Sequence, residues 1–259
     1  FPDCPGRQKP KGNQEKDVDP KLIPVIRKMV GGLQFLANTR HDILTDLNKV
    51  ARQMHHPTED TYLDALHIIQ YVSGTPDAGL SFQANTPAVL HAWVDASWLS
   101  EPNYTSRTGF CCSLGTTNAM FFSFSKAQTL ASLSTQQSEI IALSECVRTV
   151  RYFQMLLDEL GYPQADRTPI YEDNAATISF AHGRGDNTKT RHIGVKDRYA
   201  REAQSHGYIN VVKIATDDHV ADLLTKTLPP TLFQRHATTL LGMAPRARKV
   251  GGCGTESPK

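Results

Sequence analysis

The stretch from Leu90 to Trp98, LHAWVDASW, constrains the fold most, because it places an acid at the end of an apolar strand. Residues 89–93 have the apolar and β-branched character of a strand, and Val94 extends it to Asp95. A carboxylate in this position is costly to desolvate unless a partner pairs with it. Two interpretations are open: Asp95 caps a turn, or it binds a metal ion together with carboxylates from elsewhere in the chain.

The patterns around this stretch predict a mixed sheet flanked by helices, which is an α/β fold. Short β-type runs follow one another and favour an antiparallel meander, at 79–82, 89–95, 108–114 and 119–124. Further strands are expected at 168–171 and 208–214. Apolar periodicity predicts a long helix at 134–161 and shorter ones near 174–180, 192–205, 219–226 and 231–241.

About three helices are expected before the sheet. Apolar residues recur at three- and four-residue intervals in 21–36 and 41–55, and Glu59 and Asp60 open a helix that ends at Gly74. We therefore expect four parts, namely a polar N-terminal tail at 1–20, a helical unit at 21–78, an α/β domain at 79–242, and a basic, glycine-rich tail at 243–259.

Composition excludes several classes of protein. Of the 259 residues, 39% are hydrophobic and 21% are charged, as in globular domains, and a net charge of +2 permits a nucleic-acid partner without indicating one. Five cysteines without a CxxC pair argue against a disulfide framework or zinc ribbon and favour a reducing, intracellular compartment. No apolar run has the length of a membrane span, and no signal peptide is visible. The first residue is Phe1, which suggests a processed or excised piece.

Four acidic residues occupy places from which they can converge. Asp95 ends a strand, Asp173 follows one, Glu139 stands in the first turns of the long helix, and Asp222 lies in an apolar run. In open α/β sheets such chain ends meet at one edge, and four carboxylates meeting there would repel unless divalent cations neutralised them. Two such ions can clamp the attacking water and the leaving oxygen of phosphodiester hydrolysis. Each acid also has a local alternative, which is a helix-dipole partner for Glu139, an N-cap for Asp173 and an early helix position for Asp222.

Eight stretches within 21–241 are similar to motifs of one known family and follow one another in the same order as in that family. They are VGGLQFLANTRHDI, VSGTPDAGL, WVDASW, SRTGF, LSTQQSEIIALSE, IYEDNAATI, TRHIGVKDRYARE and HVADLLTKTLP. They resemble the C-terminal part of the polyprotein of copia-type (Ty1/copia) retrotransposons, which comprises the connection segment and the ribonuclease H domain. The resemblance implies a ribonuclease H-like sheet preceded by a small helical connection unit. It also implies an endonuclease that cuts the RNA strand of an RNA–DNA hybrid by two-metal in-line hydrolysis.

The resemblance also implies roles for individual residues. Asp95, Glu139, Asp173 and Asp222 match the family's Asp-Glu-Asp-Asp site, which would hold two Mg²⁺ ions, with Mn²⁺ as the alternative. His192 matches the Lys-His-Ile-Asp motif and would bind substrate or shuttle a proton. A packed or surface histidine is the alternative for His192, and His219, close to Asp222, is the competing candidate. Residues expected to contact the hybrid are Arg107, Lys126, Asn174, Lys189, Arg191, Lys196 and Lys226, although each basic one could equally be a solvated surface charge.

Departures from the family pattern keep other functions open. At seven positions the family usually has an acidic or basic residue and this chain has another one. These positions are Ser97, Gln137, Gly194, His67, Gln70, Ser73 and Ala127. Loss of basic side chains weakens nucleic-acid affinity, because phosphate contacts supply most of its sequence-independent part. The alternatives to a ribonuclease H are a domesticated, non-catalytic subunit of a larger ribonucleoprotein assembly, and a hybrid-binding module that does not cleave. A polymerase domain or such an assembly would hold the polar tails. The four retained carboxylates favour the enzyme.

Overall fold

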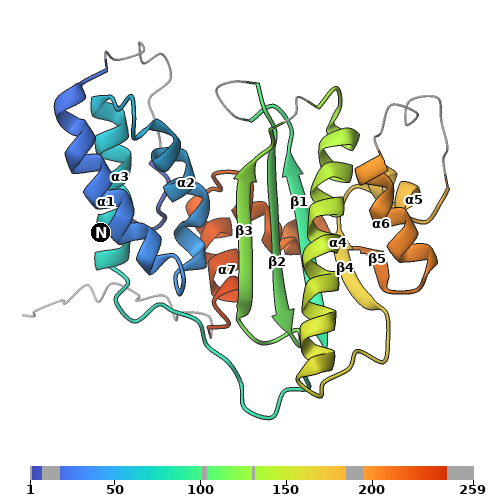
Figure 1. The fold of residues 1–259 in the computed structure, drawn as a ribbon. Coiled ribbons are helices and arrows are strands. Elements are labelled where there is room, and N and C mark those ends of the chain that lie inside the picture. Colours follow the sequence, from blue (N-terminus) through green and yellow to red (C-terminus); the bar gives the residue numbers. More distant parts are fainter. Residues whose placement is uncertain (1, 8–17, 101–103, 130–131, 185–194, 244–259) are drawn as a thin grey trace, which may run out of the picture.

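A five-stranded sheet forms the centre of the computed structural model, which describes residues 2–7, 18–100, 104–129, 132–184 and 195–243, with the side chains of 195–197 left out (Figure 1). The strands are β1 (Leu90–Ser97), β2 (Arg107–Leu114), β3 (Met120–Ala127), β4 (Thr168–Glu172) and β5 (Ile209–Lys213). Their order is β3-β2-β1-β4-β5. Strands β1, β2 and β3 form the predicted antiparallel meander, and β1, β4 and β5 run parallel. The predicted mixed α/β sheet flanked by helices is confirmed.

The predicted strand at 79–82 is wrong. These residues lie in an irregular segment that makes isolated backbone contacts, from Ser81 N to Leu241 O at 2.8 Å and from Ala119 N to Ser81 O at 3.0 Å. Phe82 is 55% exposed. The short apolar run therefore lacks both the continuous ladder and the buried face that stabilise a strand.

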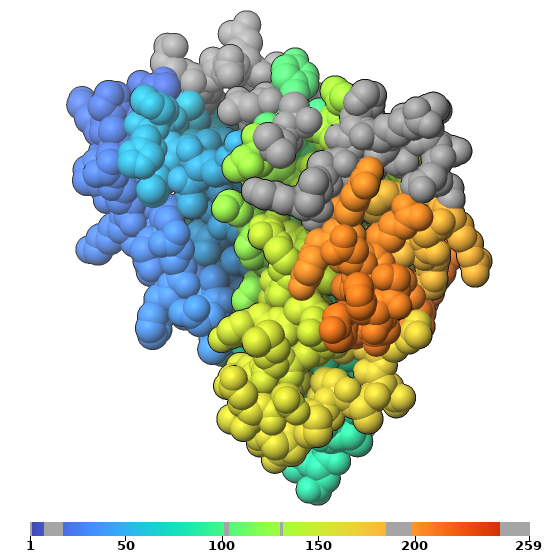
Figure 2. All heavy atoms as spheres, turned by 45° about the vertical axis from the view of Figure 1, so that its right-hand side comes forward, coloured from blue at the N-terminus to red at the C-terminus, as the bar shows by residue number. Residues whose placement is uncertain are grey.

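The long helix α4 (Thr135–Glu159) covers one face of the sheet. Ser134 caps it by accepting from Gln137 N, and the apolar stripe of α4 packs on the alternate residues of β1 that point to this side. Helices α5 (Ala175–Ala181) and α6 (Val195–Ser205) lie beside it. Figure 2 shows α4 in yellow-green between the helical unit in blue and the α5–α6 segment in yellow to orange.

The opposite face of the sheet carries the C-terminal elements. These are the short 3₁₀ helices η4 (Thr216–Asp218) and η5 (Val220–Leu224), followed by α7 (Pro230–Leu240). The helix predicted at 219–226 is therefore a 3₁₀ turn, while that predicted at 231–241 forms as α7. Trp93 points to this face, between β1 residues that point to α4.

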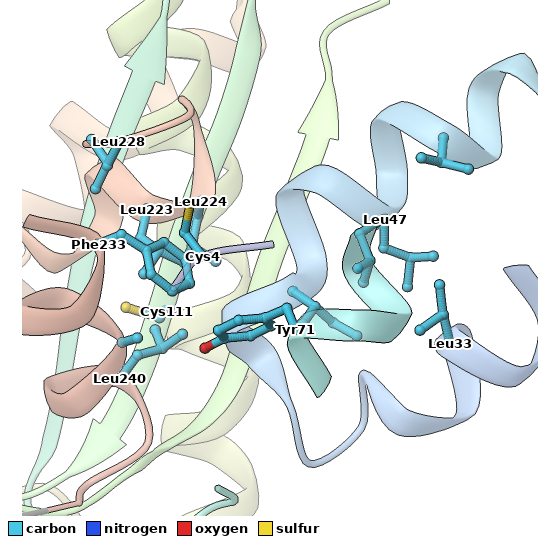
Figure 3. Close-up of a cluster of buried hydrophobic side chains, with 14 of the residues drawn as sticks. Cys4, Leu33, Leu47, Tyr71, Cys111, Leu223, Leu224, Leu228, Phe233 and Leu240 are labelled. Atoms are coloured by element: carbon cyan, nitrogen blue, oxygen red, sulfur yellow. The ribbon is translucent and has the colours of Figure 1, made fainter. Parts of the chain in front are cut away.

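The predicted helical unit forms three α-helices: α1 (Ile23–Leu36), α2 (Leu44–Gln53) and α3 (Glu59–Ser73), with 3₁₀ turns η1 (Pro20–Leu22) and η2 (His41–Ile43). It lies beside β3, where Asn48 Nδ2 donates to Ser125 O at 2.7 Å. Its apolar residues join those of η5 and α7 in one hydrophobic cluster, in which Tyr71 meets Phe233 edge-on at 5.7 Å between ring centroids (Figure 3).

Among the described residues, no helix has the length and hydropathy needed to cross a membrane. Cys4, Cys111, Cys112 and Cys146 are buried free thiols.

Candidate metal centre

The carboxylates of Asp95 and Asp222 meet where the end of β1 contacts η5. Both side chains are buried, at 3% exposure each. One oxygen of each, together with one ring nitrogen of His219, lies within 4.8 Å of the others. Because Asp95 is far from His219 and Asp222 in the sequence, the fold assembles the group.

Gly109 allows η5 to approach β1 this closely. It lies on β2 directly opposite Asp95. A Cβ atom at Gly109 would be 2.5 Å from Thr225 Cγ2 and 2.8 Å from Leu224 Cβ, far inside van der Waals contact. The missing side chain therefore gives the segment that carries Asp222 room to pack on the sheet, and it lets the Thr225 hydroxyl donate to Asp95 Oδ2.

Glu139 adds a third buried carboxyl from the first turns of α4, at 4% exposure. Its pKa is raised to about 11, first by burial and then by the charges of Glu172 and Asp95. Oε2 of Glu139 is buried and has no hydrogen-bond partner among the described residues. At neutral pH Glu139 therefore keeps its proton unless a cation offsets the surrounding negative charge.

Glu172 is a fifth acid that the sequence did not single out. It is the last residue of β4 and is fully buried, and its Oε1 accepts from Asn174 N at 2.9 Å. Its pKa is raised, mainly by burial. The alternation of side chains along the strand could have identified it. Glu172 falls on the same face of β4 as Ile170, which packs toward α4, so its carboxyl group is expected to be buried.

Asp173 is half-buried beside this group, and its Oδ2 accepts from the Thr216 hydroxyl at 3.0 Å. The N-cap of α5 is Asn174, whose Oδ1 accepts from the backbone N–H groups of Ala176 and Thr177. Asn174, and not Asp173, is therefore the N-cap of α5. Asp173 directly follows the end of β4, which runs parallel to β1, so it lies at the same edge of the sheet as Asp95, and its charge helps to raise the pKa of Glu139 and of Glu172.

Lys226 supplies positive charge to the group. Its Nζ lies 2.9 Å from Asp222 Oδ1 and 3.9 Å from Asp95 Oδ2, and its side chain is 42% exposed. The pKa of Asp222 is raised to about 6, by burial first and by the Asp95 charge second, while Lys226 opposes this rise. The single ammonium group of Lys226 thus faces two buried carboxylates. For Glu139 and Glu172, the described residues show no ion pair with a basic side chain.

The other residues that were predicted to contact the substrate lie in different environments. Arg107 is fully buried and its Nη1 donates to Ser125 Oγ at 2.9 Å, so it links β2 to β3 rather than presenting its charge to solvent. Lys126 is exposed on β3. Four predicted residues lie outside the described parts or, for the last, have only the backbone described: Lys189, Arg191, His192 and Lys196.

The donor set fits a divalent cation. Carboxylate oxygens are the ligands that Mg²⁺ prefers. Buried acids with raised pKa values and an unpartnered oxygen on Glu139 are stabilised when a cation is bound, because the ion offsets both the desolvation and the mutual repulsion.

No protein-family model matches the chain. The chain is 32% identical over 216 residues, 83% of its length, to the retrovirus-related Pol polyprotein from transposon RE1 of Arabidopsis thaliana. It is 30% identical over 234 residues, 89% of its length, to the one from transposon TNT 1-94 of Nicotiana tabacum. The transposon Ty1-DR5 Gag-Pol polyprotein of Saccharomyces cerevisiae is 26% identical over 226 residues. The chain spans only 14%, 17% and 13% of these relatives.

Solved structures with a similar backbone include RNase H1 from Halobacterium salinarum, which aligns with 52% of this chain and 93% of its own at a TM-score of 0.37 and 15% identity. The foamy viral protease-reverse transcriptase in complex with an RNA/DNA hybrid aligns with 85% of this chain and 28% of its own, at a TM-score of 0.47 and 9% identity.

Proposed function

Because the chain is homologous to one segment of the Pol polyproteins of copia-type transposons, we propose that it is the ribonuclease H part of such a polyprotein. The proposed reaction is hydrolysis of the RNA strand of an RNA–DNA hybrid. The observation that supports this most directly is the buried carboxylate group at the end of β1, which brings Asp95 and Asp222 together with Glu139 close by. A protein without a use for a cation gains nothing from burying mutually repelling acids.

Asp95, Glu139, Asp173 and Asp222 would hold two Mg²⁺ ions, with Mn²⁺ as the alternative. When bound, such ions activate water as the nucleophile and stabilise the leaving oxygen. The chain's own residues orient the ligands. The Thr225 hydroxyl fixes Asp95, and Glu172 holds the turn that presents Asp173 by accepting from Asn174 N. Because the centre is buried on the sheet side, the phosphodiester would approach from the exposed side, where Lys226 lies.

The hybrid would contact exposed basic side chains around this edge. Lys126 is exposed on β3, and Lys226 is partly exposed at the centre itself. Contacts by Arg191, His192 and Lys196 remain predictions. A polymerase domain of the same polyprotein is the proposed neighbour of this segment, and the buried free thiols favour a reducing intracellular compartment.

A cleavage assay tests the proposal. The protein is incubated with an RNA–DNA hybrid labelled on the RNA strand, in Mg²⁺ or in Mn²⁺. We expect cleavage that Asp95→Asn abolishes and that Asp77→Asn, at an exposed position in the turn after α3, leaves unchanged. Absence of cleavage in both metals, or cleavage that survives Asp95→Asn, contradicts the enzyme.

The same samples separate the alternative functions. A salt titration of hybrid binding measures the number of phosphate contacts through the slope of log affinity against log salt. Steep salt-dependent binding without turnover would identify a hybrid-binding module, and absence of both would favour a non-catalytic subunit. The neutral residues at Gln70 and Ser73 of α3 are the feature that favours these alternatives.

A further inference from the structure

His219 lies directly before η5, and its imidazole is fully buried against β1. Its Nε2 is 2.9 Å from Val94 O. A carbonyl oxygen only accepts hydrogen bonds, so Nε2 carries the proton and Nδ1 has a free lone pair. Nδ1 is buried and has no hydrogen-bond partner among the described residues. Buried polar atoms are usually paired, so this lone pair calls for a hydrogen-bond donor or for a metal cation that accepts the electron pair.

The surroundings of His219 offer further ligand atoms for such a cation. A ring nitrogen of His219 and one oxygen each of Asp95 and Asp222 lie within 4.8 Å of one another. Ligand atoms about 2.0–2.3 Å from a common ion satisfy this spacing. Nε2 is already engaged by Val94 O, which leaves Nδ1 as the nitrogen able to coordinate. Metal-binding histidines characteristically donate their second ring N–H to such a backbone carbonyl, which fixes the tautomer and the ring orientation.

Lys226 does not block this arrangement. Its side chain is 42% exposed, so its ammonium group can move into solvent when a cation binds Asp222. The imidazole of His219 has no such freedom, because it is buried and tied to β1. An incoming ion would therefore replace the lysine and retain the histidine.

We propose that His219 Nδ1 is a metal ligand, so that the ion beside Asp222 has a mixed nitrogen and oxygen donor set. This inference rests on the metal centre of the proposed function and adds a ligand outside the four carboxylates. An imidazole donor favours first-row transition ions, whereas Mg²⁺ is a hard ion that prefers oxygen. The site beside Asp222 therefore binds Mn²⁺ more tightly than Mg²⁺, and His219 contributes to that difference.

Mn²⁺ itself is the probe. Pulsed electron paramagnetic resonance of the Mn²⁺-loaded full chain, without nucleic acid, detects the hyperfine coupling of a directly bound nitrogen. We expect such a coupling, and we expect it to change when the histidines are labelled with ¹⁵N. His219→Gln should abolish it and weaken Mn²⁺ binding by about tenfold or more, in line with the usual effect of losing a ligand's orientation or donor atom. The glutamine amide can still donate to Val94 O.

His182→Gln is the matched control, because His182 Nε2 bonds a strand carbonyl in the same way, at 2.9 Å from Val211 O, and His182 is not part of the group formed by Asp95, His219 and Asp222. The control should keep both the coupling and the affinity. A wild-type spectrum without nitrogen coupling, or a coupling that persists in His219→Gln, overturns the proposal. The wild-type spectrum decides even if His219→Gln does not fold. Since no substrate is present, missing cleavage would contradict the proposed function and leave this result standing.

Discussion

Replacing Gly109 with alanine tests how closely the segment carrying Asp222 must pack on the sheet. The backbone of Gly109 is not in the left-handed region, so alanine is compatible with its conformation. The cost comes from contact alone. The added Cβ would lie 2.5 Å from Thr225 Cγ2, 2.8 Å from Leu224 Cβ and 2.9 Å from the Leu224 carbonyl carbon. The last two atoms cannot rotate away, since they belong to the backbone or are fixed to it.

The size of the effect follows from these distances. Restoring ordinary contact at about 3.4 Å requires η5 to move away from β2 by roughly 0.5–0.9 Å. Overpacking of this kind costs about 1–3 kcal/mol, and the reduced entropy of the unfolded chain recovers about 0.4–1 kcal/mol of it. We expect Gly109→Ala to lower the free energy of unfolding by about 1–2 kcal/mol. The same shift displaces Asp222 from Asp95 and should weaken Mn²⁺ binding.

Urea denaturation and Mn²⁺ titration of the same samples provide the measurement. Gly31→Ala is the control, because Gly31 is exposed on α1 and an added Cβ meets nothing within 4 Å. This control should stabilise the protein by about 0.5–1 kcal/mol through helix propensity and leave the ion affinity unchanged. If Gly109→Ala is as stable as wild type and binds Mn²⁺ equally well, the close packing of η5 does not position the site.

Substitutions at three further residues probe the scaffold by urea denaturation. Thr45→Val removes a hydroxyl that donates to Leu223 O at 2.8 Å and should cost about 1–2 kcal/mol, whereas Thr45→Ser should cost clearly less. Arg40→Met leaves Asp42 buried without its ion-pair partner at 2.8 Å and should cost about 3–5 kcal/mol; a loss below about 1 kcal/mol would contradict this. Burial, followed by nearby positive charge, lowers the pKa of His236 to about 4, so its contribution to stability is present above pH 6.5 and is lost as the pH falls toward 4. His236→Gln should remove about 3 kcal/mol of this pH dependence, and an unchanged slope between pH 6.5 and 4 would refute the assignment.

Elements with a repeating local signal could be predicted from the sequence. The helix at 135–159 has a long apolar stripe and a serine cap, and β1 to β3 follow one another with turn residues between them. The run at 79–82 was apolar enough to suggest a strand, but a strand also needs a neighbour on which to form a ladder. That neighbour is set by tertiary packing, which leaves Ser81 with single contacts to Leu241 and Ala119.

Four acids of the candidate site, Asp95, Glu139, Asp173 and Asp222, could be named from the sequence because each lies in or beside a recognisable element, whereas Glu172 was missed. The structure brings Asp95 and Asp222 together, and their role as metal ligands stays a prediction. The ion pair of Lys226 and the free lone pair of His219 could not be predicted in this way. Both depend on the course of the backbone around η5, where a predicted α-helix is a 3₁₀ turn that faces β1 with different side chains.

The helical unit helps to support the candidate metal centre. Thr45 on α2 donates to the carbonyl of Leu223, the residue that follows Asp222, and Asn48 donates to Ser125 on β3. One hydrophobic cluster runs from this unit through η5 into α7 (Figure 3). The hydrophobic cluster therefore continues across the proposed boundary between residues 78 and 79, so the two parts pack as one body. The segment bearing Asp222 packs against Gly109 on one side and α2 on the other, so removing 1–78 should loosen the carboxylates of the site even though all five of its acids are retained.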